Sequence, residues 1–259
     1  MDRRLEQSLI LQERTLTPES IAWVNKIQQA ASEAGTAGYI KGGVIRDYIS
    51  NLYNGTTLAP KDLDVVLLRG VNYVVGGLLN QGAKIRLRRN RRKTPVFEML
   101  LPTNQGVIEA DIGIVLGKPN SYERGFTPGT ILEDDARLSD FTVNTLFLSL
   151  GKTLSVENII DPLNGIQDIK DKVIRMVAPN TFVRNPECML RAVRMADRLS
   201  ATIEPATVDA IRTYSHLIKR APRPVIDQNL EILLGSPNQD SNVRTLEELG
   251  LMNYLNKSL

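Results

Sequence analysis

The acidic residues of two apolar stretches are spaced for metal chemistry. In "DLDVVLL", Asp62 and Asp64 are two residues apart, so a strand would place both carboxylates on one face, roughly 6.5 to 7 Å apart. In "GVIEADIGIV", Glu109 and Asp111 have the same spacing. Carboxylates on one face can hold Mg²⁺, which bridges triphosphate oxygens and activates a hydroxyl for attack. Either Glu109 or Asp111 could complete such a cluster, and the acidic solvent face of an edge strand is the alternative interpretation.

A paired-glycine turn precedes these acids along the chain. In "GYIKGGVIRD", Gly42 and Gly43 lie between an expected strand and an expected helix. Residues without side chains let the backbone approach phosphates, and the first N–H groups of a helix have no partner within that helix. The turn therefore predicts a phosphate site, although a glycine turn also occurs for purely structural reasons.

Composition limits the other kinds of chemistry. Cys188 is the single cysteine and His216 the single histidine among 259 residues, so one chain can build neither a disulfide nor a Cys/His zinc site. A Ser-His-Asp mechanism would depend on His216, which lies in the helical pattern "TYSHLIKRA". The apolar runs are too short to span a membrane and no signal peptide is recognisable, so we expect a cytoplasmic protein.

Basic residues are concentrated in one stretch, although the net charge is only +3. The stretch "KIRLRRNRRK", residues 84–93, includes Arg88, Arg89, Arg91 and Arg92 and contains no aromatic residue. We predict that these arginines follow an RNA backbone without stacking on its bases. A solvated edge strand is the alternative interpretation.

The hydrophobic periodicity changes near residue 160. Strands are expected near 39–41, 63–68, 83–89, 96–101 and 107–115, and helices near 18–34, 44–51 and 72–80. After residue 160 helical spacing prevails, and Asn185 is expected to cap a helix that begins at Pro186. The predicted fold is an α/β head with a mixed sheet and helices over residues 1–160, followed by an all-α neck-like domain over residues 161–259.

Four motifs in order resemble those of one family. "GGVIRD" followed by "DLDVVL" is similar to the signature of the class II tRNA nucleotidyltransferases, the CCA-adding enzymes, and of the bacterial poly(A) polymerases, within the DNA polymerase beta superfamily. "DDARLSDFTVNTLFLSL", "DPLNGIQDI" and "FVRNPECMLRAVRMADRL" resemble later motifs of that family. The resemblance implies that the α/β head is a nucleotidyltransferase domain.

The resemblance also implies roles for individual residues. Asp62 and Asp64 would hold two Mg²⁺ ions, and Glu109, at the position of the family's strand acid, would be the third catalytic carboxylate. The residues expected to bind nucleotide are Gly42, Gly43, Arg46, Asp140, Asn144, Asn185, Arg191 and Arg194. The implied partners are an RNA 3′ end, with tRNA preferred, and ATP, CTP or another NTP.

The largest departure from the family pattern concerns base selection. The family's E-D-x-x-R segment, whose Asp and Arg pair with the incoming base, falls on residues 184–188, so Cys188 stands where an arginine is expected. Asn185 keeps an oxygen that can accept a hydrogen bond. Loss of a charged donor removes roughly 1.5 to 3 kcal/mol of discrimination. A shifted register would pair Glu187 with Arg191, but "LRAVRMADRL" fits the family unshifted.

Two further departures concern charge and length. Leu138 and Ser139 replace two arginines next to the triphosphate, for which Arg137 or the basic stretch could compensate. The chain also ends soon after the neck-like helices. We therefore expect the family's body and tail domains to be absent, and a partner or a second copy to replace the tail.

Two classes of function fit these residues. The preferred interpretation is a template-independent, Mg²⁺-dependent RNA nucleotidyltransferase that adds nucleotides to RNA 3′ ends, as in tRNA CCA addition or repair. A poly(A) polymerase-like enzyme with altered base choice is the variant that Cys188 favours. The competing class is a catalytically inactive homologue that binds RNA. The combined presence of the glycine turn, Arg46, Asp62 and Asp64 favours an enzyme.

Overall fold

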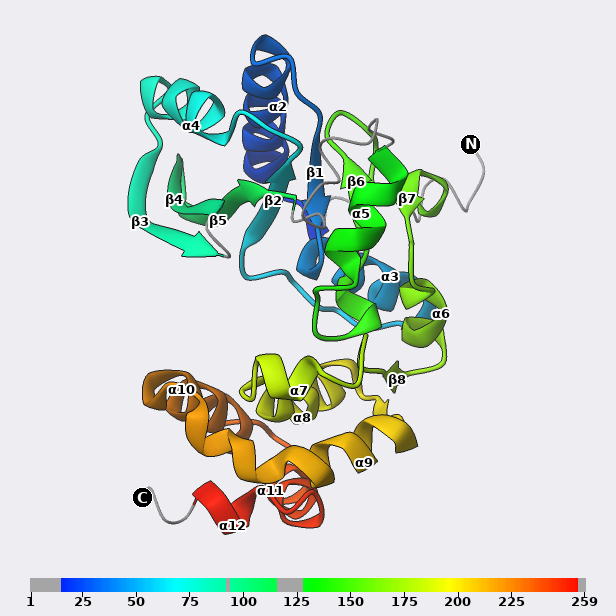
Figure 1. Ribbon diagram of the computed structural model, residues 1–259. Helices are drawn as coiled ribbons and strands as arrows, with labels where there is room; N and C mark the ends of the chain where they lie inside the picture. Colours follow the sequence, from blue (N-terminus) through cyan, green and yellow to red (C-terminus); the bar gives the residue numbers. More distant parts are fainter. Residues whose placement is uncertain (1–14, 92–93, 116–127, 256–259) are drawn as a thin grey trace. The chain divides into compact units, whose positions relative to one another are not determined.

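The computed structural model describes residues 15–91, 94–115 and 128–255, and the chain divides into two compact units (Figure 1). Unit 1 comprises Met1–Ala136 and Asn144–Pro162, and unit 2 comprises Arg137–Val143 and Leu163–Leu259. The division differs from a single cut after residue 160, because the short segment Arg137–Val143 belongs to unit 2. Within the described ranges, no helix combines the length and the apolar character needed to cross a membrane.

Unit 1 is built on a seven-stranded mixed sheet with the order β3-β4-β5-β2-β1-β6-β7. The strands are β1 (Gly38–Lys41), β2 (Leu63–Leu67), β3 (Lys84–Arg91), β4 (Thr94–Thr103), β5 (Gly106–Ile114), β6 (Phe147–Ser149) and β7 (Ile159–Ile160). Within this sheet β2 and β5 are parallel neighbours, and the other neighbours are antiparallel. Leu63 and Val65 of β2 are buried on one face, so Asp64 between them points to the opposite face.

The helices of unit 1 lie close to their predicted positions. In α2 (Pro18–Glu33), Thr17 is the N-cap, and its Oγ1 accepts a hydrogen bond from Ser20 N at 3.2 Å. α2 packs against α4 (Val71–Asn80), as Figure 1 shows, and Trp23 Nε1 donates to the Pro102 carbonyl of β4 at 2.8 Å. The other helical elements of unit 1 are α3 (Gly43–Asn54), α5 (Pro128–Ala136) and η2 (Val156–Asn158). The short helix η1 (Thr142–Asn144) crosses the division, with Thr142 and Val143 in unit 2 and Asn144 in unit 1.

Unit 2 is mainly helical, as predicted. Its elements are α6 (Gly165–Lys170), β8 (Val173–Ile174), α7 (Thr181–Arg184), α8 (Cys188–Leu199), β9 (Thr202–Ile203), α9 (Pro205–Tyr214), η3 (Ser215–Arg220), α10 (Arg223–Leu234), α11 (Gln239–Glu248) and α12 (Met252–Leu255). α8 is central, since it packs against both α10 and α11. Met189, Ala192 and Val193 form its buried apolar stripe.

The start of α8 differs from the prediction. Asn185 ends α7 with a φ of −140° and a ψ of 84°, and α8 begins at Cys188 without a side-chain cap. The N–H groups of Cys188 and Met189 bond to the carbonyls of Asn185 and Pro186, each at 3.0 Å. The predicted helix start at Pro186 is therefore wrong, because a backbone turn precedes α8 in place of a side-chain cap.

Candidate functional site

The glycine turn lies between β1 and α3 in unit 1. Gly42 has a φ of +69° and a ψ of −111°, a conformation that residues with side chains rarely adopt. Its N–H bonds to the Leu146 carbonyl at 3.0 Å, and its carbonyl accepts from Arg46 N at 2.9 Å. Among the described residues, no side chain caps the start of α3. The first N–H groups of α3, beginning at Gly43, are thus arranged as in helix N-termini that bind phosphate.

Arg46 and Asp47, in the first turns of α3, are both buried. The guanidinium of Arg46 donates through Nε and Nη2 to Asp47 Oδ1 at 2.9 and 2.8 Å. Its Nη1 donates to Asn144 Oδ1 at 2.7 Å. Arg46 therefore joins the start of α3 to Asn144. These are contacts within the protein, whereas the family resemblance implies a phosphate contact for the arginine.

Asp64 and Asp111 lie side by side on neighbouring strands. The parallel register of β2 and β5 pairs Asp64 with Asp111. Such partners point to the same face of a sheet, and their strands are about 4.8 Å apart. The register of β4 and β5 pairs Glu98 with Asp111, which extends the acidic row by one strand. Asp62 is exposed and precedes the first residue of β2.

Glu109 lies on the same face of β5 as Asp111, one alternation earlier. Its carboxylate accepts a hydrogen bond from Arg86 Nη1 of β3 at 2.6 Å. The side chains of Arg86 and Glu109 are 55% and 58% exposed, and exposed ion pairs contribute little to stability. The structure therefore places Asp111 in register with Asp64, and it pairs Glu109 with a surface arginine.

The carboxylate pair suits a magnesium ion that is shared with a ligand. Mg²⁺ in proteins is commonly bound by one or two carboxylates, with water and substrate phosphates as its other ligands. In the part of the chain that the structure describes, no group of three or more Asp, Glu, His or Cys side chains is arranged to hold a metal. Asp64 and Asp111 thus fit a metal that is also bound by a triphosphate.

A charged pair that the sequence does not reveal lies beside the glycine turn. Lys41 directly precedes Gly42, and its ammonium forms a salt bridge with the carboxylate of Asp135 in α5. The Lys41 side chain is 17% exposed and that of Asp135 is 3% exposed. The ammonium also lies 5.4 Å from the ring centroid of Phe147. The only local signal for this pair is a lysine next to two glycines, because its partner is 94 residues away.

Unit 2 holds the other residues expected to bind nucleotide. Arg191 of α8 donates through Nη1 to Asp140 Oδ2 at 2.7 Å, and Asp140 Oδ1 accepts from Phe141 N at 2.8 Å. Burial acts to lower the pKa of Arg191, but the negative charge of Asp140 raises that pKa above its usual value. Asn185 and Arg194 are half-buried, at the end of α7 and within α8. Asp140 and Arg191 are thus brought together in one ion pair.

The basic stretch forms β3, an edge strand in the order of the sheet. β3 carries Arg88, Arg89 and Arg91, and Arg92 lies outside the described residues. Most of the polar loop expected over residues 117–130 also lies outside them, and α5 begins at Pro128. An edge strand rich in cations is compatible with an RNA surface and with protection against edge-to-edge pairing.

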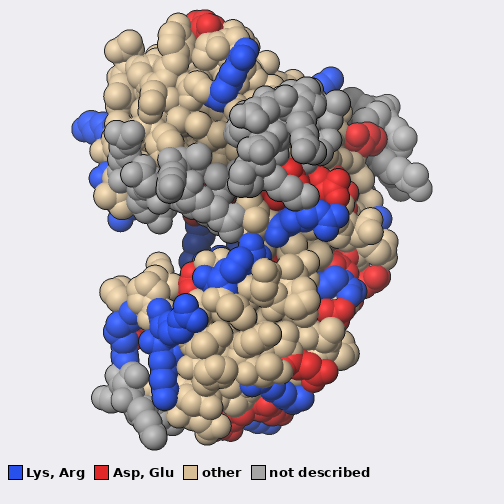
Figure 2. Space-filling view, in the orientation of Figure 1, with Lys and Arg blue, Asp and Glu red and all other residues tan. Residues whose placement is uncertain are grey.

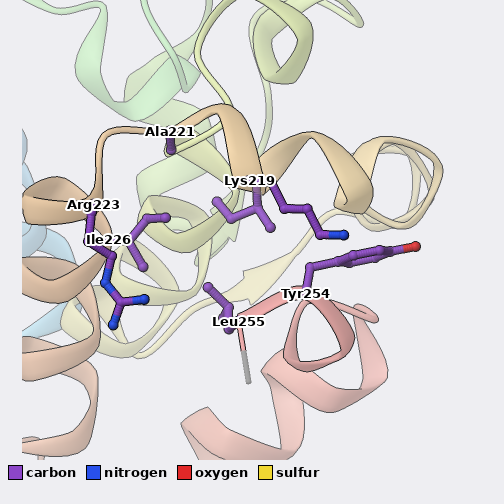
Figure 3. A pocket seen from close by; sticks show the side chains of 7 residues that line it. Lys219, Ala221, Arg223, Ile226, Tyr254 and Leu255 are labelled. Carbon is purple, nitrogen blue, oxygen red and sulfur yellow. The ribbon is translucent and has the colours of Figure 1, made fainter. Parts of the chain in front are cut away.

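Unit 2 contains a cavity of about 350 Å³, lined by Ile218, Lys219, Ala221, Arg223, Ile226, Tyr254 and Leu255 (Figure 3). Ile226 and Leu255 lie between Lys219 and Arg223, which flank the cavity on two sides. Lys219 Nζ lies 4.9 Å from the ring centroid of Tyr254. In Figure 2, Lys and Arg side chains gather on the part of unit 2 near α10. The cavity thus combines an apolar floor with cationic sides.

Comparison with known families matches two models to this chain. Residues 38–175, more than half of the chain, match the model described as the poly A polymerase head domain. Residues 202–259 match the model described as the probable RNA and SrmB-binding site of polymerase A. The first match includes the glycine turn, Asp64 and Asp111, and the second includes every residue that lines the cavity of unit 2.

Individual relatives are similar over part of their length. The chain is 40% identical to the A-adding tRNA nucleotidyltransferase of Deinococcus radiodurans over 126 residues, which are 47% of this chain and 28% of the relative. It is 28% identical to poly(A) polymerase I of Salmonella typhi over 238 residues, 89% of this chain and 49% of the relative. The chain therefore spans about half of these curated relatives or less.

A solved structure confirms the predicted fold. The structure of a CCA-adding enzyme with CTP superposes with a TM-score of 0.73 at 20% sequence identity. The superposition covers 95% of this chain and 54% of the other. The chain thus shares the α/β head and the helical region that follows it with that structure.

Proposed function

This chain belongs to the poly A polymerase head-domain family, and on that premise we propose that it transfers nucleotides from NTPs to RNA 3′ ends without a template. The observation that carries the proposal is the register of Asp64 with Asp111. β1, which ends at the glycine turn, is the other neighbour of β2, so a phosphate site and a metal site would adjoin. The A-adding relative acts on tRNA by its name, which favours a tRNA 3′ end and CCA addition or repair.

Each residue of the unit 1 site would have a distinct task. The N–H groups at the start of α3 would bind triphosphate oxygens. Asp64 and Asp111 would hold Mg²⁺, which supplies positive charge and lowers the pKa of the 3′-hydroxyl. Transfer joins the RNA 3′ oxygen to the α-phosphorus and breaks the bond to pyrophosphate, so the protein mainly positions the reactants. Arg46 would fix the shape of the turn through Asp47 and Asn144.

We assign the role of third carboxylate to Asp111 in preference to Glu109. The support is the register, which pairs Asp111 and not Glu109 with Asp64. Asp62, just before β2, would be the remaining carboxylate. Under this assignment Glu109 is no longer expected to be a catalytic carboxylate, whereas Asp62 and Asp64 still are.

The residues of unit 2 that are expected to select the base are poorly suited to that task. Cys188 is 2% exposed and has no guanidinium with which to pair with a base. Asn185 offers an amide, and Arg191 is engaged with Asp140. We therefore expect relaxed nucleotide choice. This observation favours a second candidate, a poly(A) polymerase-like enzyme that adds A to varied RNA ends, an activity that the Salmonella relative's name indicates for that protein.

The proposal is tested by incubating the protein with Mg²⁺ and each labelled NTP in turn. The acceptors are tRNA lacking CCA, tRNA ending in C, and an unrelated oligoribonucleotide. Ordered addition of C, C and A to tRNA alone would identify CCA addition, whereas addition of A to every acceptor would identify the second candidate. If RNA binds with salt-dependent affinity and no NTP is incorporated, the chain is an inactive RNA-binding homologue and the proposal is wrong.

The cavity of unit 2 is the proposed contact for the RNA upstream of its 3′ end. Proteins bind single-stranded RNA by stacking bases on aromatic rings and by tracking phosphates with cations. Tyr254 supplies a ring, and Lys219 and Arg223 supply cations around an apolar floor. The description of the family model that covers residues 202–259 also names RNA.

Tyr254→Ala is expected to weaken binding of a single-stranded oligoribonucleotide about tenfold, because stacking contributes about 1 to 3 kcal/mol per base. Fluorescence anisotropy with a labelled oligoribonucleotide measures this change. Tyr53→Ala is the matched control, since Tyr53 is a 45% exposed tyrosine of unit 1. Equal affinity of the Tyr254→Ala variant and the wild type, with a loss in an Arg88→Gln/Arg89→Gln variant, would move the RNA site to β3.

A further inference from the structure

Lys41 is a cation on the face of the sheet that carries Asp64. The antiparallel register of β1 and β2 pairs Ile40 with Val65, so Lys41 lies alongside Asp64 at the next position. Residues opposed on adjacent strands point to the same face. The register of β1 and β6 pairs Lys41 with Phe147, and the short distance of the ammonium from that ring agrees with a shared face. Lys41 therefore lies between the carboxylates and the glycine turn.

The arginine on the other side of the turn is already engaged. Arg46 donates hydrogen bonds to Asp47 and Asn144, and its side chain is 10% exposed. A triphosphate at the start of α3 brings several negative charges. It therefore requires a cation that Arg46 is poorly placed to supply.

The salt bridge of Lys41 has a geometry that suits a binding role. Asp135 is almost fully buried and Lys41 remains partly exposed. Buried ion pairs add little net stability, because the loss of hydration offsets the attraction. An ammonium has three N–H donors, and Asp135 is the carboxylate it bonds to among the described residues. Asp135 thus holds the ammonium in place and leaves donors for another oxygen.

We propose that Lys41 binds a phosphate of the incoming nucleoside triphosphate and that Asp135 is its positioning residue. The inference rests on the proposed function, since it requires an NTP at the glycine turn. The contact is to phosphate, so the gain in affinity is the same for every base.

The decisive variant removes both charges of the pair. Lys41→Met alone removes the cation of this salt bridge while the almost fully buried Asp135 keeps its charge, and is expected to lower the melting temperature. Lys41→Met/Asp135→Asn removes both charges of the pair, so the melting temperature should recover. Its affinity for ATP and for CTP, measured with Mg²⁺ and without RNA, should stay roughly tenfold to a hundredfold weaker than that of the wild type. Lys41→Arg should bind both nucleotides more tightly than the double variant.

The outcomes separate this inference from the proposed function. Lys152→Met is the control, because Lys152 is an exposed lysine after β6 and should leave both affinities unchanged. A double variant that binds ATP and CTP as tightly as the wild type would show that Lys41 only tethers α5, and would overturn this inference alone. A wild-type protein that binds neither nucleotide would overturn the inference and the proposed function together.

Discussion

Asp64→Asn is expected to lower the rate of nucleotide transfer at least about a thousandfold, a loss of about 4 kcal/mol of transition-state stabilisation. The amide keeps the size of the side chain but removes the charge and one of the oxygens that bind Mg²⁺. Asp64 is paired with Asp111 across β2 and β5. The substitution therefore also relieves the repulsion between the two carboxylates. Single-turnover incorporation of labelled NTP, with saturating Mg²⁺ and acceptor RNA, measures the effect.

The control for Asp64→Asn is Glu33→Gln in α2. Glu33 is an exposed carboxylate that accepts a hydrogen bond from Gln29 at 3.0 Å, and its loss should leave transfer unchanged. The melting temperature of each variant shows whether the fold is retained. Transfer that survives in an Asp62→Asn/Asp64→Asn double variant would place the reaction elsewhere in the protein.

Asp111→Asn and Glu109→Gln are expected to differ strongly in activity. Asp111→Asn should lower transfer at least about a hundredfold, because the metal loses a carboxylate ligand. Glu109→Gln should change transfer less than about threefold. Glu109 forms an exposed ion pair with Arg86, and such pairs contribute little to stability, so its loss should leave the fold intact. The Mg²⁺ concentration that gives half-maximal transfer should rise in the first variant and stay constant in the second.

The two acids of β5 are matched controls for each other, since they share a strand and a face. The reverse order of effects would restore Glu109 as the third carboxylate, the role that the family resemblance implies for it. Equal and large effects would mean that both carboxylates take part, and equal and small effects would remove β5 from the site.

Local features of the site can be predicted from the sequence because they depend on adjacent residues. Two glycines between an apolar strand and an amphipathic helix predict the turn at Gly42, and the spacing of Asp62 and Asp64 predicts a shared face. The cap at Thr17 follows from the same kind of signal. The turn at Gly42 and the cap at Thr17 are confirmed, because few alternative local structures satisfy the same residues. Asp62 precedes the first residue of β2, so its shared face with Asp64 stays a prediction.

Non-local features require the structure. Alternation puts Glu109 and Asp111 on one face of β5, but only the register with β2 decides which of them lies next to Asp64. The salt bridge of Lys41 with Asp135 joins elements 94 residues apart. Asn185 is a good capping residue by type, yet it lies at the end of α7, and backbone hydrogen bonds form the turn between it and α8. Sequence periodicity carries no information on such pairings.

The register of β5 also limits which insertions and deletions the turn between β4 and β5 can tolerate. Thr103 and Gly106 are paired at the turn that joins β4 to β5. If one residue were inserted or deleted there and β5 shifted along β2, the Asp111 side chain would turn away from the acidic face. If two residues were inserted, Glu109 would lie opposite Asp64 on the same face. Single-residue insertions at this turn should therefore be rare among active variants of the chain. In variants with two inserted residues, Glu109 would take the position of Asp111.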